Sequence, residues 1–206
     1  MSFTFQFLRG GKITPFIDEL GALRIAVFRE FPYLYEGTLA YERPYLERYA
    51  ASERSLIVTM RKNGQLVGAT TCLPLVDEMD DFRRPFEEQG LPLEDYFYFG
   101  ESIILPPCRG QGAGSRFFQF REEHAASFDN ISVTTFCAVE RPGDHPEKPP
   151  GYRPLHDFWN RLGYRKEPGL QCILPWKELH SDYEVQHTLT FWTKPVATHS
   201  SGEVAS

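Results

Sequence analysis

A glycine-rich segment near the middle of the chain carries the most specific chemical signal. Gly110, Gly112 and Gly114 stand at alternate positions, directly after Arg109 and before an amphipathic run. Glycine has no side chain, so an anion can approach the backbone closely at these positions. Free amide groups in the first turn of a helix then point at that anion. The spacing predicts a loop that holds a pyrophosphate group at the start of a helix.

Three phosphate-binding patterns can be compared with this loop. A P-loop needs a lysine beside its second glycine, and no lysine lies within residues 105–118. The dinucleotide fingerprint G-x-G-x-x-G fits Gly110 and Gly112, but Ser115 stands at its third glycine, and four predicted strands precede the loop. The pattern R/Q-x-x-G-x-G/A matches residues 109–114 at every defined position.

A carboxylate in the strand before this loop is a candidate general base. Glu101 lies in an apolar run, and counting by twos places it on one face with Phe99 and Ile103. Burial among apolar side chains makes an unpaired carboxylate more ready to accept a proton. The alternative is that an arginine pairs with Glu101 and that its role is structural. The sequence leaves both interpretations open.

A second group of titratable residues follows the next predicted strand. Glu140, Asp144 and His145 stand in a long proline-rich loop that could wall a substrate pocket, although incidental surface charges are the simpler account. His145 as a base is the minority interpretation. Cys137 has no identifiable base partner and is read as a buried structural thiol rather than a nucleophile. His124 falls on the apolar face of a predicted helix and is read as a core histidine.

Hydrophobic periodicity outlines the elements that must position these residues. Strands are expected at residues 3–8, on both sides of the Asn63-Gly64 turn, and at residues 95–105, 131–139 and 187–195. Helices are expected from the Thr14-Pro15 cap, from near Pro44, within residues 76–90, directly after the glycine loop, and at residues 155–163.

The order of these elements predicts an α/β fold with a mixed sheet. The strands on either side of the glycine-loop helix are expected to be parallel, because a helical crossover joins them. Residues 1–196 are expected to form a single domain. Residues 197–206 are expected to be a disordered tail.

Composition narrows the class of protein. The 206 residues carry a net charge of −6, which argues against a nucleic-acid partner. The four cysteines are scattered, which is typical of reduced thiols rather than of disulfides or a zinc site. Neither a signal peptide nor a membrane span is apparent, so a cytoplasmic protein without a membrane partner is expected.

From residue 16 to residue 194 the chain resembles the GNAT superfamily of acyl-CoA-dependent N-acyltransferases. The resemblance rests on the paired N-terminal helices, the hairpin NGQLVGATT, the loop ESIILPPCRGQGAGSRFF and the later helix LHDFWNRLGYRK. The stretches FREE and RPGDHP look like a bacterial branch of that family. The resemblance implies a mixed, mostly antiparallel central sheet flanked by helices, with a splayed parallel strand pair that forms a wedge for coenzyme A. It also implies acetyl-CoA as co-substrate and no metal.

The resemblance assigns the binding of acetyl-CoA to particular positions. Backbone groups of Ile103, Ile104 and Leu105 would pair with the pantetheine arm. The loop would hold the pyrophosphate through its amides, with charge added by Arg109 and by Arg116. The loop positions are Arg109, Gly110, Gln111, Gly112, Ala113, Gly114 and Ser115.

One position departs from the family pattern. Trp159 stands where many members have a tyrosine that protonates the departing thiolate, and an indole N–H is not a practical acid. Either Tyr152 or Tyr164 replaces it, or water protonates the thiolate.

Three functions follow from the resemblance. The first is direct transfer of an acetyl group to a primary amine of a small molecule, in a ternary complex. The second is a protein N-acetyltransferase, and the third is an acyl-CoA-binding regulatory module without turnover. A homodimer is common in the family, although the sequence does not indicate one. A tyrosine-rich segment could cage a cationic acceptor, with help from Glu36 or Glu42, or could simply pack on the sheet. Its tyrosines are Tyr33, Tyr35, Tyr41, Tyr45 and Tyr49.

Overall fold

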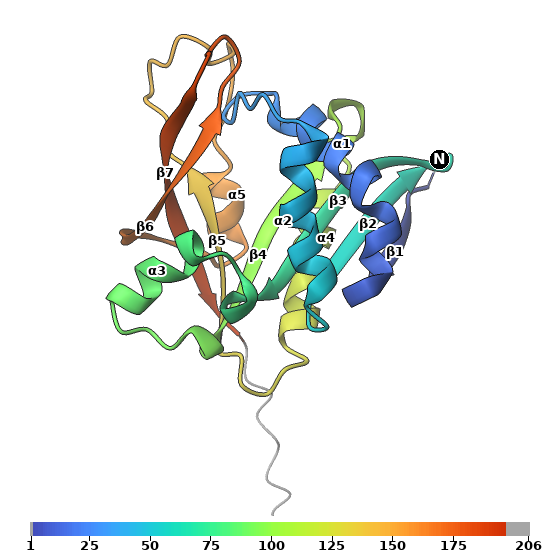
Figure 1. The fold of residues 1–206 in the computed structure, drawn as a ribbon, viewed down its shortest axis with the longest axis vertical. Helices are drawn as coiled ribbons and strands as arrows, with labels where there is room; N and C mark the ends of the chain where they lie inside the picture. Colours follow the sequence, from blue (N-terminus) through green and yellow to red (C-terminus); the bar gives the residue numbers. More distant parts are fainter. Residues whose placement is uncertain (1, 197–206) are drawn as a thin grey trace, which may run out of the picture.

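The computed structural model describes residues 2–196, which form a seven-stranded mixed sheet in the order β1-β2-β3-β4-β5-β7-β6 (Figure 1). Strands β4 and β5 are parallel, and each other neighbouring pair is antiparallel. This confirms the expected mixed, mostly antiparallel sheet, while the expected tail lies outside the described residues. The strands are β1 Thr4–Leu8, β2 Leu56–Lys62, β3 Gln65–Pro74, β4 Tyr96–Ile104, β5 Val133–Val139, β6 Arg165–Lys177 and β7 Glu184–Pro195.

Helices cover both faces of this sheet. Helices α1 and α2 pack on one face, which we call the α1/α2 face, and α4 and α5 lie on the other, the α4 face (Figure 1). The short helix α3 contacts β6. The helices are α1 Ile17–Phe28, α2 Leu39–Ala51, α3 Asp80–Glu88, α4 Ala113–Ala125 and α5 His156–Arg161.

Helices α1 and α2 do not begin at the residues that Pro15 and Pro44 suggest. Thr14 and Pro15 lie in a 3-10 turn, and α1 starts only at Ile17, without a side-chain cap. Helix α2 starts well before Pro44, because the Thr38 hydroxyl caps it by accepting from the Tyr41 amide. In both places the proline marks the neighbourhood of a helix start rather than the start itself.

The sequence pattern missed strand β6. Its residues include Pro168, Gly169 and Pro175, which favour a loop over a strand. The strand forms nevertheless because it lies at the edge of the sheet, where a proline costs no ladder bond on the open side. An irregularity between Glu167 and Gln171 absorbs the first proline and the glycine.

A β-bulge in β4 changes which face its side chains occupy. Thr70 of β3 pairs with Ser102, but Cys72 pairs with Phe99, so β4 has one residue more than β3 in this interval. The bulge breaks the alternation of side chains. Phe99 therefore packs on the α4 face, against Phe118, whereas Glu101 lies on the α1/α2 face. The expectation that Phe99 and Glu101 share a face is wrong for this reason.

The parallel pair separates just beyond this level. Its pairing runs from Tyr96 opposite Val133 to Tyr98 opposite Thr135 and then stops. Both strands continue, β4 to Ile104 and β5 to Val139. They therefore enclose a wedge whose closed end is at Tyr98 and Thr135 and whose open end faces the glycine loop. This confirms the splayed parallel pair.

We predict that Gly100→Ala lowers stability by about 1–3 kcal/mol, because an added methyl group overpacks a filled core. A Cβ at this position would lie 2.8 Å from the Tyr45 hydroxyl and would overlap those of Tyr49 and Thr71. Gly169→Ala is the matched control, since that strand glycine has open space around its Cβ position. Urea denaturation measures both variants, and equal midpoints would contradict the packing described here.

Candidate active site

The glycine loop has the geometry of an anion site. Gly110 and Gly112 have φ angles of 74° and 79°, which residues with a side chain rarely adopt. Gly112 is the N-cap of α4, so the amides of the first helical turn have no partner within the helix. A Cβ at either glycine would meet nothing within 4 Å. The backbone is therefore open to a ligand on the side toward which its amides point.

The two arginines near the loop make other contacts than expected. Arg109 donates from Nε to the Ile104 carbonyl at 2.8 Å and pairs with Glu30 at 2.7 Å. The guanidinium of Arg116 lies over the Phe5 ring, 4.4 Å from its centroid. Both guanidinium groups have partners outside the loop in this arrangement, and their contact with a pyrophosphate stays a prediction. The groups that the loop itself offers to an anion are its backbone amides.

Strand β4 offers fewer backbone groups to the wedge than expected. The Leu105 amide donates to the Val67 carbonyl of β3 at 2.9 Å, so it is already used. The backbone groups of successive residues alternate between the two edges of an antiparallel strand. The backbone groups of Ile103, like the Leu105 amide, therefore point toward β3, and those of Ile104 point toward the wedge. Of the three expected residues, Ile104 alone presents its carbonyl there, and Arg109 covers it.

Glu101 is held at the closed end of the wedge, on the α1/α2 face. Its side chain forms an ion pair with Arg24 and accepts a hydrogen bond from the Tyr45 hydroxyl at 3.0 Å. Its amide donates to the Thr71 hydroxyl and its carbonyl accepts from the Thr70 hydroxyl at 2.7 Å. The residue is 8% exposed. Such contacts fix the position of a carboxylate before any ligand binds.

Arg24 joins two buried carboxylates. It pairs with Glu42 as well as with Glu101, and its guanidinium lies 4.0 Å from the centre of the Tyr45 ring. Burial disfavours its charged form, but the carboxylates outweigh burial and raise the pKa of Arg24. The Tyr35 hydroxyl donates to Glu42 at 2.7 Å. Two carboxylates and one guanidinium leave the cluster with one net negative charge.

A second buried arginine lies behind the bulge, on the α4 face. Arg121 sits between the Phe99 and Phe118 rings, 4.4 Å from each centroid, and donates to the Glu101 carbonyl at 3.4 Å. Burial lowers the pKa of Arg121. Within residues 2–196 no carboxylate lies within ion-pair distance of it. A cation in this position supports the bulge from the opposite face of the sheet.

Comparison with known proteins shows which family this chain belongs to. Residues 22–164 match the family model described as the acetyltransferase (GNAT) family. The chain belongs to the GNAT acetyltransferase family. It is therefore an acyltransferase, as the resemblance predicted. A search of curated proteins finds no match.

Solved structures share the GNAT fold over nearly the whole chain. The ribosomal-protein-alanine N-acetyltransferase of Brucella melitensis is 14% identical, covering 95% of this chain and 99% of its own, with a TM-score of 0.58. YncA of Salmonella typhimurium, solved with its cofactor acetyl-CoA, is 11% identical, covering 100% of both chains, with a TM-score of 0.55. A GNAT acetyltransferase of Streptococcus pneumoniae is 12% identical, covering 95% of this chain and 100% of its own, with a TM-score of 0.58.

The two expected acid candidates of this GNAT chain have different surroundings. Tyr164 is fully buried on the α4 face and donates to Glu122 at 3.0 Å, with Thr134 also at 3.0 Å. Burial, reinforced by Glu122, raises the pKa of Tyr164. Tyr152 is partly buried and packs edge-on against Phe31, with ring centroids 4.7 Å apart. The structure therefore places the Tyr164 phenol on the other face of the sheet from the Glu101 carboxylate, and the Tyr152 ring beside Phe31.

Trp159, at the family's tyrosine position, is a packing residue. Its ring contacts Phe136 at 5.0 Å and Trp192 at 5.1 Å between centroids. His124 is a core histidine, with Nε2 2.8 Å from the Arg54 carbonyl. The Cys137 thiol lies 3.3 Å from the Tyr98 hydroxyl, in keeping with a structural thiol.

Two of the three titratable residues in the loop after β5 make structural contacts. Glu140 pairs with Lys166 at 2.6 Å, which lowers the pKa of Glu140 in spite of desolvation. Asp144 is exposed, and His145 packs against Phe31. None of the three contacts Glu101 in the described part of the chain. The idea that this loop walls a substrate pocket stays a prediction.

The structure supplies the arginine partner that the sequence analysis held open for Glu101, but the sequence did not identify Arg24 or Arg121 as the residues that contact it. Arg24 is the sole basic residue between Ile17 and Phe28, and a lone cation within an apolar helix was the available signal. Arg121 had a similar signal, because it falls on the buried side of a helix that is otherwise lined by phenylalanines. No pattern in the sequence links either arginine to Glu101, since the bulge determines both contacts.

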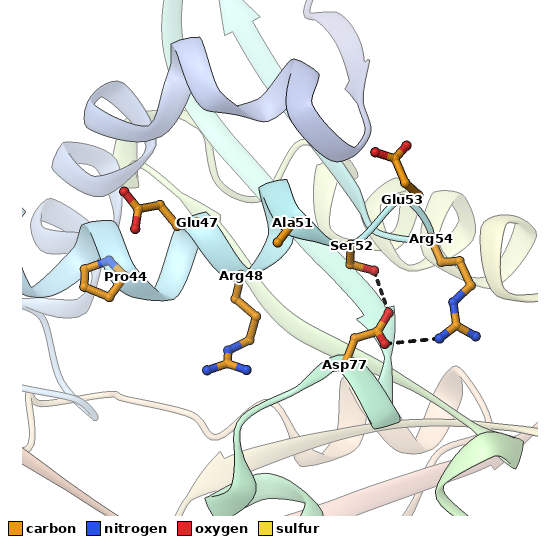
Figure 2. Close-up of a pocket in the computed structure, with 8 residues that line it drawn as sticks. All are labelled: Pro44, Glu47, Arg48, Ala51, Ser52, Glu53, Arg54 and Asp77. Carbon is orange, nitrogen blue, oxygen red and sulfur yellow. Dashed lines mark hydrogen bonds and ion pairs between the residues drawn. The ribbon is translucent and has the colours of Figure 1, made fainter.

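A groove beside α2 lies outside this site (Figure 2). Asp77 accepts hydrogen bonds from Ser52 at 2.6 Å and from Arg54 at 3.1 Å, while Arg48 points along the groove without a partner among the labelled residues. The wall contains no residue of the glycine loop or of β4 within the described chain. We assign no role to this groove.

Two wider properties concern residues 2–196. No helix there has the length and apolar content that crossing a membrane requires. In the same part of the chain, no group of three histidine, cysteine or acidic side chains is arranged to hold a metal ion.

We predict that Glu78 makes stability depend on pH. Its carboxylate is buried without a hydrogen-bond partner in the described structure, and burial raises the pKa of Glu78 from 4.5 to about 8. The folded state therefore binds a proton more tightly than the unfolded state, and stability falls as pH rises from about 4.5 to 8. Glu78→Gln stays neutral and should lose less stability over this range, by at least about 1 kcal/mol.

Urea denaturation at pH 5 and at pH 8 measures this difference. The exposed Glu123 supplies the control, since Glu123→Gln should follow the wild type. Parallel curves for wild type and Glu78→Gln would show that the Glu78 carboxylate is solvated.

Proposed function

We propose that this GNAT protein transfers the acetyl group of acetyl-CoA to a primary amine of a small molecule, by direct attack in a ternary complex. The observation that carries the proposal is the arrangement of the wedge. The glycine loop offers backbone amides at its open end, and Glu101 presents a fixed carboxylate at its closed end. Acetyl-CoA lying along the wedge would place its pyrophosphate on the loop and its thioester beside Glu101.

Glu101 would act as the general base. An amine attacks a thioester only in its neutral form, so an ammonium must first give up a proton. Arg24 and Tyr45 both contact the Glu101 Oε2 atom, and Oε1 is the other oxygen of the same carboxylate. We assign the acceptance of the proton to Oε1. A backbone amide on the wedge side of β4 would polarise the thioester carbonyl.

The charge of the cluster supports a cationic acceptor. Glu42, Glu101 and Arg24 together carry one net negative charge, which favours an ammonium over an anion at this place. The aromatic ring of Tyr45 lies in the same cluster and can contact a cation through its face.

A segment that covers the proposed site favours a small-molecule acceptor over a protein acceptor. The segment between α1 and α2 is bonded to the β6–β7 hairpin, where the Leu179 amide donates to the Leu34 carbonyl at 2.7 Å and the Glu36 amide donates to the Lys177 carbonyl at 2.8 Å. Figure 1 shows this segment reaching from the helix pair to the hairpin, and we take it to cover the acceptor side. A protein N-acetyltransferase is the alternative and would need a more open groove. Turnover with any amine would rule out a module that only binds acyl-CoA.

We predict that Gly112→Arg abolishes acetyl-CoA binding, because its side chain would fill the anion site. Gly90→Arg is the matched control: Gly90 also has a positive φ angle, of 68°, and open space at its Cβ position, but it follows α3. Isothermal titration calorimetry with acetyl-CoA compares the two folded variants with the wild type. Unchanged affinity in Gly112→Arg would place the pyrophosphate elsewhere.

We predict that Glu101→Gln lowers kcat by about 100-fold or more, as loss of a general base does, while acetyl-CoA still binds. A panel of diamines, amino sugars and amino-acid amides, assayed by release of free thiol, supplies the acceptor. Glu42→Gln removes the other carboxylate from Arg24 and should cost less than Glu101→Gln. A Glu101→Gln enzyme with wild-type kcat would remove Glu101 from the chemistry.

A further inference from the structure

Arg121 is a buried charge that the proposed mechanism does not use. The residue is 2% exposed and lies between the Phe99 and Phe118 rings. An arginine stays charged in proteins, and a buried charge without a counter-charge is costly. We propose that Arg121 is a positioning residue whose counter-charge is the surplus negative charge around Glu101, and that it keeps Glu101 in the ionised form that a base requires. The proposal rests on the proposed acetyl transfer and deepens it.

The ionisable groups on the α4 face do not supply the counter-charge of Arg121. Glu122 follows Arg121 on α4, but it pairs with Lys194 at 2.9 Å and accepts a hydrogen bond from Tyr164 at 3.0 Å. Burial raises the pKa of Tyr164, and it raises the pKa of Cys72 to about 12, so both groups are neutral at pH 7. The Arg121 Nη2 atom is buried without a hydrogen-bond partner in residues 2–196. The positive charge is therefore unmatched on its own face.

The α1/α2 face has the opposite imbalance. Glu42 and Glu101 share a single guanidinium, that of Arg24, which leaves one negative charge over. Glu78 adds little to this charge, because burial raises the pKa of Glu78 to about 8. Burial also raises the pKa of the phenols of this region and keeps them neutral; they belong to Tyr33, Tyr45 and Tyr49. One positive charge behind the sheet and one negative charge in front of it sum to zero.

The backbone of Glu101 connects the two faces. Arg121 Nη1 donates to the Glu101 carbonyl at 3.4 Å, while the Glu101 side chain pairs with Arg24 on the opposite face. The bulge in β4 produces this arrangement, because it turns the Glu101 side chain away from α4. Both Arg121 and Glu101 are buried, so solvent screens their attraction only weakly.

The attraction has a consequence for the base. Two carboxylates that share one guanidinium disfavour each other's charged form, so one of them tends to hold a proton. A Glu101 that already holds a proton cannot take one from an ammonium. Arg121 opposes this tendency from behind the strand. The acceptor approaches on the α1/α2 face, where the carboxylates are nearer to it than Arg121 is, so the preference for a cation is kept.

The first test is the pH dependence of kcat/KM, measured on the full chain with the most active amine of the panel. We expect Arg121→Met to move the acidic limb of the profile to higher pH by about one unit or more, because the neutral variant leaves the surplus charge uncompensated. Arg121→Lys keeps the charge and should keep the limb in place. The amine is the same for each variant, so a difference between profiles comes from the enzyme.

Arg116→Met is the matched control for this test. Arg116 lies on the same helix and also over a phenylalanine ring, but it is exposed, so its removal should leave the profile unchanged. A folded Arg121→Met enzyme with the wild-type profile would overturn the proposal, even if that variant is less stable. A purely structural role lowers stability without moving the limb.

The second test needs no acceptor. In the wild type, Glu101→Gln should lower the urea midpoint, because Arg24 loses a partner. In Arg121→Met, the same change should raise the midpoint by about 0.5 M or more, because Glu42 and Arg24 then balance each other. If Arg121→Met alone does not fold, the double variant should recover folding. Glu122→Gln is the control and should not raise the midpoint of Arg121→Met.

Two outcomes separate this proposal from the proposed function. Additive effects of Arg121→Met and Glu101→Gln on the urea midpoint, or a double variant that stays unfolded, would overturn the role of Arg121. A wild type that binds acetyl-CoA but acetylates no amine would overturn the proposed function, while the urea experiment would still test the charge balance across the sheet.

Discussion

Strand β4 carries one residue more than β3 between Phe99 and Ser102, and the site depends on that extra residue. Without it, Glu101 would follow the alternation of Phe99 and would face α4. With it, Glu101 reaches Arg24 and Tyr45 on the α1/α2 face, while its carbonyl stays within reach of Arg121 on the opposite side. Gly100 makes the bulge possible, because the hydroxyls of Tyr45 and Tyr49 occupy the place of a side chain.

The bulge lies near the closed end of the wedge. Pairing between β4 and β5 stops at Tyr98 and Thr135, so the strands diverge from the level of Glu101 toward the glycine loop. A thioester ligand that lies along this opening would have its pyrophosphate at the backbone amides of the glycine loop and its thioester beside the Glu101 carboxylate. Arg141 and Trp176 hold the segment between α1 and α2 against the other half of the sheet through the Tyr33 carbonyl.

Much of this arrangement follows from local patterns in the sequence, and the remainder depends on contacts between distant residues. The glycine loop, the helix that follows it and the parallel pair are predictable, because each is set by neighbouring residues and by a short crossover. Strand β6 was missed because its prolines are acceptable only at a sheet edge, which is a property of the whole sheet. The face of Glu101 was misjudged because a bulge leaves no mark on hydrophobic periodicity. The contacts of Arg109 with Ile104 and Glu30 could not be predicted, because they depend on folding that brings the end of α1 to the loop.

The most direct test of the wedge is a crystal structure of the protein with acetyl-CoA. The account predicts the pyrophosphate on the amides of residues 111–115 and the pantetheine arm between β4 and β5, with the thioester beside Glu101. It also predicts that Arg109 leaves the Ile104 carbonyl, which it covers in the free protein. Acetyl-CoA bound elsewhere, for example in the groove beside α2, with Arg109 still on Ile104, would contradict the account.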